Sequence, residues 1–268
     1  MDTINWYISF RDVFSVKMPF LNTISALSLL LSSFEFKLRS RTAPQHFSRE
    51  GGKLGLVNTI LNTLNFNNKS QELELDDYFE LIHAPSATKQ AFSEARQKIN
   101  PLALKELFDV TVANVAADPD LATVKGYTPA AIDGSTIAID NIPELIEYFG
   151  CSGPKKSSCT GRISIACETV HGVILDAAIY PYKKGERAIA MEHIDKVVSL
   201  GVANPLFIFD RGYNSLQLMA HVDDLNCKYL LRVRNRWLKK LISSTPSGEW
   251  AEFTYGKKSY RMRVINLL

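Results

Sequence analysis

Two aspartates stand where the sequence otherwise predicts strands of a buried sheet. Asp133 lies within an Ala-Ile-Asp-Gly-Ser-Thr-Ile run at residues 131–137, and Asp210 directly follows a Pro-Leu-Phe-Ile-Phe run at residues 205–209. The apolar neighbours predict that both carboxylates are buried. An ionised carboxylate in an apolar core costs roughly several kcal/mol unless it is paired or binds a metal. We therefore expect the two strands to bring both carboxylates to one divalent-metal site.

Each aspartate alone also has an ordinary structural interpretation. Asp133 precedes a glycine, and Asp-Gly is a common turn pair. Asp210 stands where it can cap a following helix. Together the two carry more weight, because Mg²⁺ is typically held by one or two carboxylates plus waters and substrate phosphates.

The spacing of apolar residues changes near residue 131, which separates a helical part from a mixed part. Before it, helical spacing and capping signals predict helices over residues 52–66, 73–82, 88–98 and 101–115. Ser86 is the predicted cap of the third helix, and Pro101 suits the first turn of the fourth. This helical part is compatible with a DNA-binding helical hairpin and equally with a plain bundle.

From residue 131 the pattern predicts a mixed α/β sheet whose first strands are antiparallel. Strands rich in Ile, Val and Thr are expected over residues 131–139, 162–170 and 173–180, followed by 206–210 and 229–233. Helical spacing over residues 186–200 and 218–225 separates the later strands. Two further strands, over residues 250–255 and 259–265, are expected to pair across Gly256-Lys257. We therefore predict an N-terminal helical region at 1–120, an α/β core at 121–240 and a β-rich segment at 241–268.

Charge and composition restrict the partners only weakly. The net charge of +3 and the pI of about 8.6 permit a polyanionic partner without requiring one. Residues 228–240 hold basic side chains and no acid: Lys228, Arg232, Arg234, Arg236, Lys239 and Lys240. With Trp237 available to stack on a base, this segment is the predicted DNA contact, and a merely solvated basic face is the alternative.

Two other features have ordinary interpretations. Residues 18–34 are apolar but too short and too polar for a confident spanning helix, so a buried N-terminal helix is expected rather than a membrane anchor or an export signal. The four cysteines lack zinc-site spacing and form no evident disulfide framework, which favours a reducing compartment.

The chain resembles the DDE-type transposases of bacterial insertion sequences, which have ribonuclease-H-like catalytic cores. The resemblance is carried by Ile132-Asp133-Gly134-Ser135-Thr136 and by Phe209-Asp210-Arg211-Gly212-Tyr213. Residues 69–79 and 86–98 are similar to the N-terminal helical region of that group. The similarity covers about residues 47–240.

The resemblance implies that Asp133 and Asp210 are the first two acids of a catalytic triad that binds Mg²⁺ or Mn²⁺. Two metal ions would support strand cleavage and strand transfer at DNA phosphates. Arg211 would contact phosphate near the metals, or else pair with a neighbouring carboxylate. The implied partners are double-stranded DNA, as element ends and target, and a second copy of the chain, in the bacterial cytoplasm at the nucleoid with no membrane involved.

The sequence departs from the family pattern after Asp210. The family's third acid is a glutamate on a later helix, in a Tyr…Arg…Glu…Lys arrangement. Tyr260 and Arg263 match its first spacing, but the remaining glutamates, Glu249 and Glu252, lie in the expected β-rich segment. We therefore expect a C-terminally truncated transposase that is inactive as this fragment. A non-catalytic DNA-binding regulator and a Mg²⁺-dependent nuclease are the alternatives.

Overall fold

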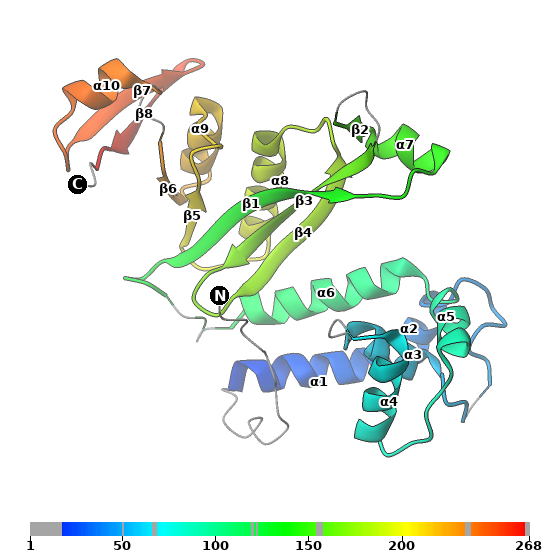
Figure 1. Cartoon of the computed structure of the whole chain (residues 1–268). Coiled ribbons are helices and arrows are strands. Elements are labelled where there is room, and N and C mark those ends of the chain that lie inside the picture. Colours follow the sequence, from blue (N-terminus) through cyan, green and yellow to red (C-terminus); the bar gives the residue numbers. More distant parts are fainter. Residues whose placement is uncertain are drawn as a thin grey trace. The chain divides into compact units, whose positions relative to one another are not determined.

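The computed structural model describes residues 18–49, 51–65, 69–118, 121, 123–153, 158–233 and 237–265. The chain divides into two compact units, Met1–Val115 and Ala116–Leu268 (Figure 1). Each unit is described separately below. The predicted domain limits at residues 120 and 240 stay predictions.

The described elements of the first unit are helices joined by loops, with one isolated bridge between Arg41 and Ile99, as the helical spacing predicts. Its helices are α1 (Met18–Ser32), α2 (Phe34–Arg39), α3 (Leu56–Leu64), α4 (Gln71–Leu81), α5 (Lys89–Arg96) and α6 (Pro101–Ala116). Helix α5 is capped by Thr88, whose side chain accepts a hydrogen bond from the Ala91 backbone N–H. The predicted cap at Ser86 is therefore wrong, because the chain enters the helix two residues later.

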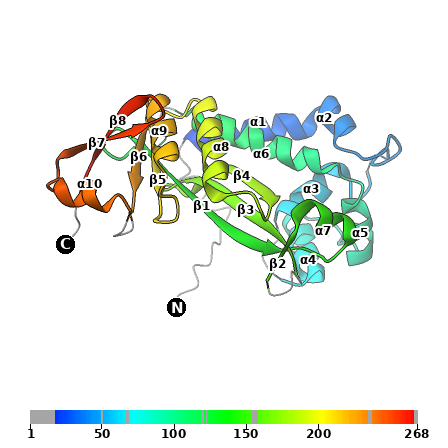
Figure 2. The ribbon, with the colours of Figure 1, turned by 90° about the horizontal axis from the view of Figure 1, so that it is seen from above.

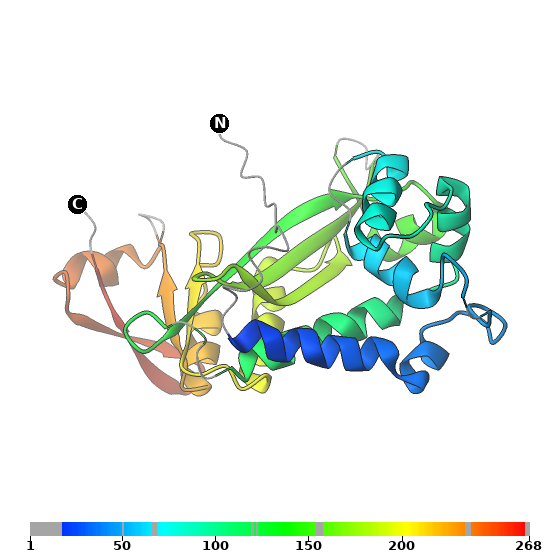
Figure 3. The same ribbon diagram turned by 90° about the horizontal axis from the view of Figure 1, so that it is seen from below.

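The core of the first unit forms where apolar faces of several helices meet. Phe36 and Ile60 are fully buried there beside Leu107 of α6. Helices α1 and α6 lie side by side (Figure 3), and leucines of α1 pack against this cluster. The predicted N-terminal helix is confirmed, but its full burial is not, since Leu29 is 74% exposed. Within the described ranges, no helix has the length and apolarity needed to cross a membrane.

The second unit is built on a mixed sheet, which confirms the predicted fold class. Its strands are β1 (Thr128–Ala138), β2 (Cys151–Ser152), β3 (Ser158–Glu168), β4 (Val173–Pro181), β5 (Pro205–Phe209) and β6 (Lys228–Leu231). Strand β3 pairs antiparallel with both β1 and β4, whereas β5 runs parallel to β1 and to β6. The strand order is β4-β3-β1-β5-β6, and β2 also pairs with β3.

Two helices, α8 (Glu186–Ser199) and α9 (Leu216–Asp224), pack against strands of this sheet. Helix α8 packs on β1, β3, β4 and β5, and its Ile189, Ile194 and Val197 are fully buried. Helix α9 contacts β6 and the hairpin of β7 (Trp250–Tyr255) and β8 (Lys258–Arg263), which pair as predicted. Short elements that the sequence did not predict are α7 (Pro143–Phe149), β2 and α10 (Lys239–Ser244). Figure 2 shows α7 and β2 together at the far end of β1 and β3.

Candidate active site

Asp133 and Asp210 lie on neighbouring strands of the sheet. Strands β1 and β5 run in parallel with Ala131 opposite Ile208, and Asp210 follows the last residue of β5. Continuing that register by two residues places Asp133 beside Asp210. Paired strands are about 4.8 Å apart, so the two aspartates meet at one edge of the sheet. The predicted adjacency of these strands is confirmed.

Both aspartates are exposed, so the predicted burial is wrong. Strand β1 is buried through Ile132 and becomes exposed from Asp133 onward, apart from half-buried Gly134. Asp210 stands just beyond β5, at the carboxyl end where parallel strands commonly expose functional groups. The apolar runs thus anchor the strands, while the carboxylates emerge where burial ends. No large desolvation cost has to be offset.

Backbone N–H groups hold one oxygen of each carboxylate. The Gly134 N–H donates to Asp133 Oδ1 at 2.8 Å, and the Gly212 N–H donates to Asp210 Oδ1 at 2.6 Å. A Cβ at Gly212 would lie 2.8 Å from Asp210 Oδ1, which only glycine avoids without a shift. In the described part of the chain, neither Oδ2 has a hydrogen-bond or ion-pair partner. Each carboxylate is therefore oriented and still has an oxygen available for a ligand.

Tyr213 is buried close to the aspartate pair, a position that the sequence did not reveal. Its side chain is buried, its ring centroid is 5.6 Å from that of Phe209, and its hydroxyl lies 3.6 Å from where a Cβ at Gly134 would stand. Burial raises the pKa of Tyr213, and the nearby carboxylates of Asp133, Glu186 and Asp210 raise it further. The Tyr213 hydroxyl therefore stays protonated and can act as a donor.

Arg162 and Glu186 form an ion pair next to this tyrosine. Arg162 belongs to β3 and is mostly buried, with its guanidinium 5.6 Å from the Tyr182 ring centroid. Glu186 is the first residue of α8. Arg162 compensates the charge of Glu186, whereas neither aspartate has a cationic partner among the described residues. Sequence spacing gave no signal for this pair, since its members are joined only by the packing of α8 on the sheet.

The predicted DNA-binding residues fall into three groups. Arg211 and Arg232 are exposed, and the Arg232 N–H donates to the Phe209 carbonyl at 3.2 Å, which places Arg232 beside the strand end that precedes Asp210. Strand β6 ends at Leu231, so Arg232 does not project from a strand as predicted. Arg234 and Arg236 lie outside the described residues.

The other members of that segment have different surroundings. Trp237 is half-buried and packs against the core cluster of α9 and the β7–β8 hairpin, which limits the ring area open to a base. Lys239 and Lys240 are exposed in the first turn of α10. Arg211 forms no ion pair with any described residue, so the alternative of a carboxylate partner is not observed.

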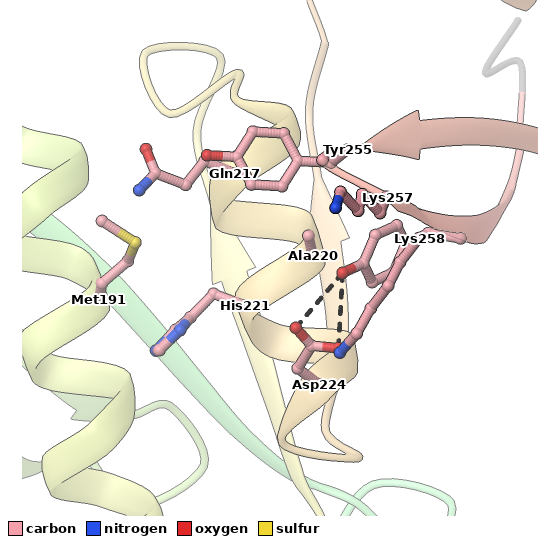
Figure 4. A pocket seen from close by; sticks show the side chains of 10 residues that line it. Met191, Gln217, Ala220, His221, Asp224, Tyr255, Lys257 and Lys258 are labelled. Carbon is pink, nitrogen blue, oxygen red and sulfur yellow. Dashed lines mark hydrogen bonds and ion pairs between the residues drawn. The ribbon is translucent and has the colours of Figure 1, made fainter.

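A cavity of about 410 Å³ lies between α8, α9 and the turn of the β7–β8 hairpin (Figure 4). Its lining includes His221, Tyr255 and Lys257, and none of the predicted site residues. At its edge Asp224 accepts hydrogen bonds from Lys258 at 2.9 Å and from Tyr260 at 3.3 Å. These contacts join the hairpin to α9. Because the lining holds none of the predicted site residues, we assign the cavity no catalytic role.

Comparison with protein families identifies this arrangement. The Transposase DDE domain family matches residues 125–264, which include both aspartates and every strand of the second unit's sheets. The chain belongs to the DDE transposase family. No curated protein is similar enough in sequence to match it.

Solved structures of DNA-rearranging assemblies show remote likeness to this DDE transposase chain. A piggyBac transposase synaptic complex with hairpin DNA has a TM-score of 0.45 at 11% identity, covering 87% of this chain and 56% of that one. A pre-cleavage Mos1 transpososome has a TM-score of 0.29 at 9% identity, covering 80% and 79%. A simian T-cell lymphotropic virus intasome in complex with PP2A regulatory subunit B56 gamma has a TM-score of 0.29 at 10% identity, covering 63% and 58%. The chain thus spans little more than half of the piggyBac chain.

DDE transposases are enzymes that cleave DNA and transfer its strands, and they generally use divalent metal ions. The donor set here fits such an ion, because two exposed carboxylates with one available oxygen each are hard ligands without a competing cation. Among the residues that the structure describes, no group of three or more His, Cys, Asp or Glu side chains is arranged to hold a metal. The aspartate pair, which supplies two carboxylates, stays a predicted metal site.

Proposed function

We propose that this chain carries the aspartates of a DNA transposase that cleaves and rejoins DNA strands with Mg²⁺ or Mn²⁺. The observation that supports it most is the parallel register of β1 and β5, which brings Asp133 and Asp210 together. Their exposure makes them accessible to a metal ion and to a DNA backbone. Family membership supplies the reaction class.

Each residue of the site has a distinct role in this proposal. Asp133 and Asp210 would hold the metal, which when bound activates the attacking oxygen and stabilises the leaving one at phosphorus. Arg211 and Arg232 are exposed close to Asp210 and would bind flanking phosphates as cations. The buried Tyr213 hydroxyl would stay protonated, and the Arg162–Glu186 ion pair would hold α8 against β3 beside it.

The proposed partners are double-stranded DNA, as element ends and as target, and a second copy of the chain. The basic segment that ends in Lys239 and Lys240 would add backbone contacts, which predicts salt-sensitive binding. We propose that the chain binds DNA at the bacterial nucleoid.

Metal binding by the chain itself tests the proposal directly. Mn²⁺ titration followed by electron paramagnetic resonance should show binding that weakens at least about tenfold in Asp133→Asn and in Asp210→Asn, because even outer-shell changes cost about 10–100-fold. Asp140→Asn is the matched control, since Asp140 is exposed just past β1. Equal affinities in all three variants would refute the aspartate pair as a metal site.

A DNA assay then separates the candidate activities. Supercoiled plasmid and labelled element-end duplexes, incubated with Mg²⁺ or Mn²⁺, should give joined products if the chain completes strand transfer. Hydrolysis without joined products would favour the nuclease. DNA affinity that is unchanged in Asp133→Asn, with neither product, would favour a non-catalytic regulator.

A further inference from the structure

Two thiols face each other across strands β2 and β3. Cys151 is directly opposite Cys159 in the antiparallel register, and both are free thiols. The remaining cysteines differ, because Cys167 lies opposite Ala131 and Ile174, and Cys227 lies just before β6. Among the described strands, Cys151 and Cys159 are the only two cysteines that lie opposite each other.

The backbone hydrogen bonds define the geometry of this pair. The Cys159 N–H donates to Asn141 Oδ1 at 2.8 Å, and the Cys159 carbonyl accepts from the Ile139 N–H at 3.0 Å. The Thr160 N–H donates to the Gly150 carbonyl at 3.2 Å, so Cys151 and Cys159 occupy a non-hydrogen-bonded position of the ladder. In such positions the Cα atoms are about 4.5 Å apart. Disulfides accept Cα separations of about 4.4–6.8 Å, so the pair can be bridged without rebuilding the strands.

We infer that Cys151 and Cys159 form a reversible dithiol–disulfide site whose oxidant is a small-molecule disulfide of the glutathione type. This inference is independent of the proposed function. The Cys151 thiolate attacks oxidised glutathione, forms a mixed disulfide and releases one reduced glutathione. The Cys159 thiolate then attacks the Cys151 sulfur and releases the second. The protein loses two protons and two electrons, and one oxidised glutathione becomes two reduced molecules.

Accessibility sets the order of these steps. Cys151 is half-buried and can meet the oxidant, whereas Cys159 is only 1% exposed. Burial raises the pKa of the Cys159 thiol, and the neighbouring Cys151 raises it further. Cys159 therefore serves as the resolving thiol, which reacts only after its neighbour is activated. A closed bridge would fasten β2 to the end of β3.

Equilibration with mixtures of reduced and oxidised glutathione tests the site. After quenching and denaturation, titratable thiols should fall from the four present in the sequence to two, without retained glutathione. Trypsin cleaves after Lys155 and Lys156, between the two cysteines, so the peptides that contain Cys151 and Cys159 should appear as one linked species that separates on reduction. Retention of two glutathiones on these peptides, or persistence of both thiols, would overturn the inference.

Variants confirm which thiols respond. Cys167→Ala with Cys227→Ala should keep the full response and lose both remaining thiols on oxidation. Cys151→Ser should abolish the linked peptides and leave Cys159 unmodified, because its sulfur is buried. A disulfide-linked peptide that contains Cys167 or Cys227 in the unmodified chain would contradict the proposed Cys151–Cys159 pair. The peptide map of the unmodified chain decides the matter even if a variant does not fold.

Discussion

Two kinds of carboxylate lie in or next to the same sheet, and they differ in burial and in hydrogen bonding. Glu168, at the end of β3, is completely buried and accepts hydrogen bonds from the backbone N–H groups of Val170 and His171 and from His171 Nδ1. Asp133 and Asp210 are exposed, and each accepts one backbone N–H. One carboxylate is saturated with donors, while the other two keep an oxygen available.

This difference indicates where the charge serves the fold and where it can serve chemistry. A buried carboxylate with several donors stabilises a turn, and removal of its oxygens leaves those donors unpaired. An exposed pair of like charges adds little to stability and attracts a cation. The comparison makes three predictions, which are given from the largest expected effect to the smallest.

Glu168→Ala should destabilise the protein by about 2–3 kcal/mol, because the β3–β4 turn loses the hydrogen bonds that this buried carboxylate accepts. Asp133→Asn should stay within about 0.5 kcal/mol of the unmodified chain, as expected of an exposed position. Urea denaturation followed by circular dichroism measures both changes. Equal destabilisation by the two substitutions would break the comparison.

Gly212→Ala should weaken Mn²⁺ binding about tenfold, because the added Cβ would lie 2.8 Å from Asp210 Oδ1 and turn the carboxylate. Gly134→Ala is the matched control. Its Cβ would be 3.5 Å from the Ile163 carbonyl and 3.6 Å from the Tyr213 hydroxyl, which are ordinary contacts. Similar loss of metal affinity in both variants would show that the site tolerates no change in backbone packing, and would remove the special role of Gly212.

Lys258→Met should lower the denaturation midpoint at neutral pH by a small but measurable amount, since exposed ion pairs contribute little. Hydrogen bonding to Lys258 lowers the pKa of Asp224. The contribution of the pair is therefore present above the unfolded carboxyl pKa of about 3.9 and is lost as the pH falls through the lower folded value. Denaturation of both proteins across acidic pH measures it, and a difference that grows on acidification would contradict this sign.

The sequence predicted most of the second unit because β1, β3 and β4 are long strands and β5 is an uninterrupted apolar run. The antiparallel pairing of β3 with β4 and the pairing of β7 with β8 across Gly256-Lys257 are both confirmed. Helix α7 was missed because it is short, and β2 because two residues carry no period. The spacing of apolar residues shows whether a segment is a helix or a strand only when the segment is long enough to repeat that spacing. An element of fewer than two turns or pleats does not repeat it.

The candidate site was predictable only in part. The aspartate pair was visible because each member interrupts or ends an apolar run. Its exposure was not, because the sequence does not show at which residue a strand leaves the core. Arg162 and Glu186 meet through tertiary packing alone. The metal and DNA roles of all these residues stay predictions.

The β1–β5 pairing also has a consequence for how the protein folds. Strands β3 and β4 and helix α8 lie between Asp133 and Asp210 in the chain. The two aspartates therefore become neighbours only when β5 pairs with β1, which is a long-range contact. Contacts between residues so distant in sequence are among the slowest to form, because a large loop must be closed first. During synthesis the aspartate pair cannot exist until β5 has emerged and docked. The gain of metal affinity during refolding would therefore report the docking of β5 on β1.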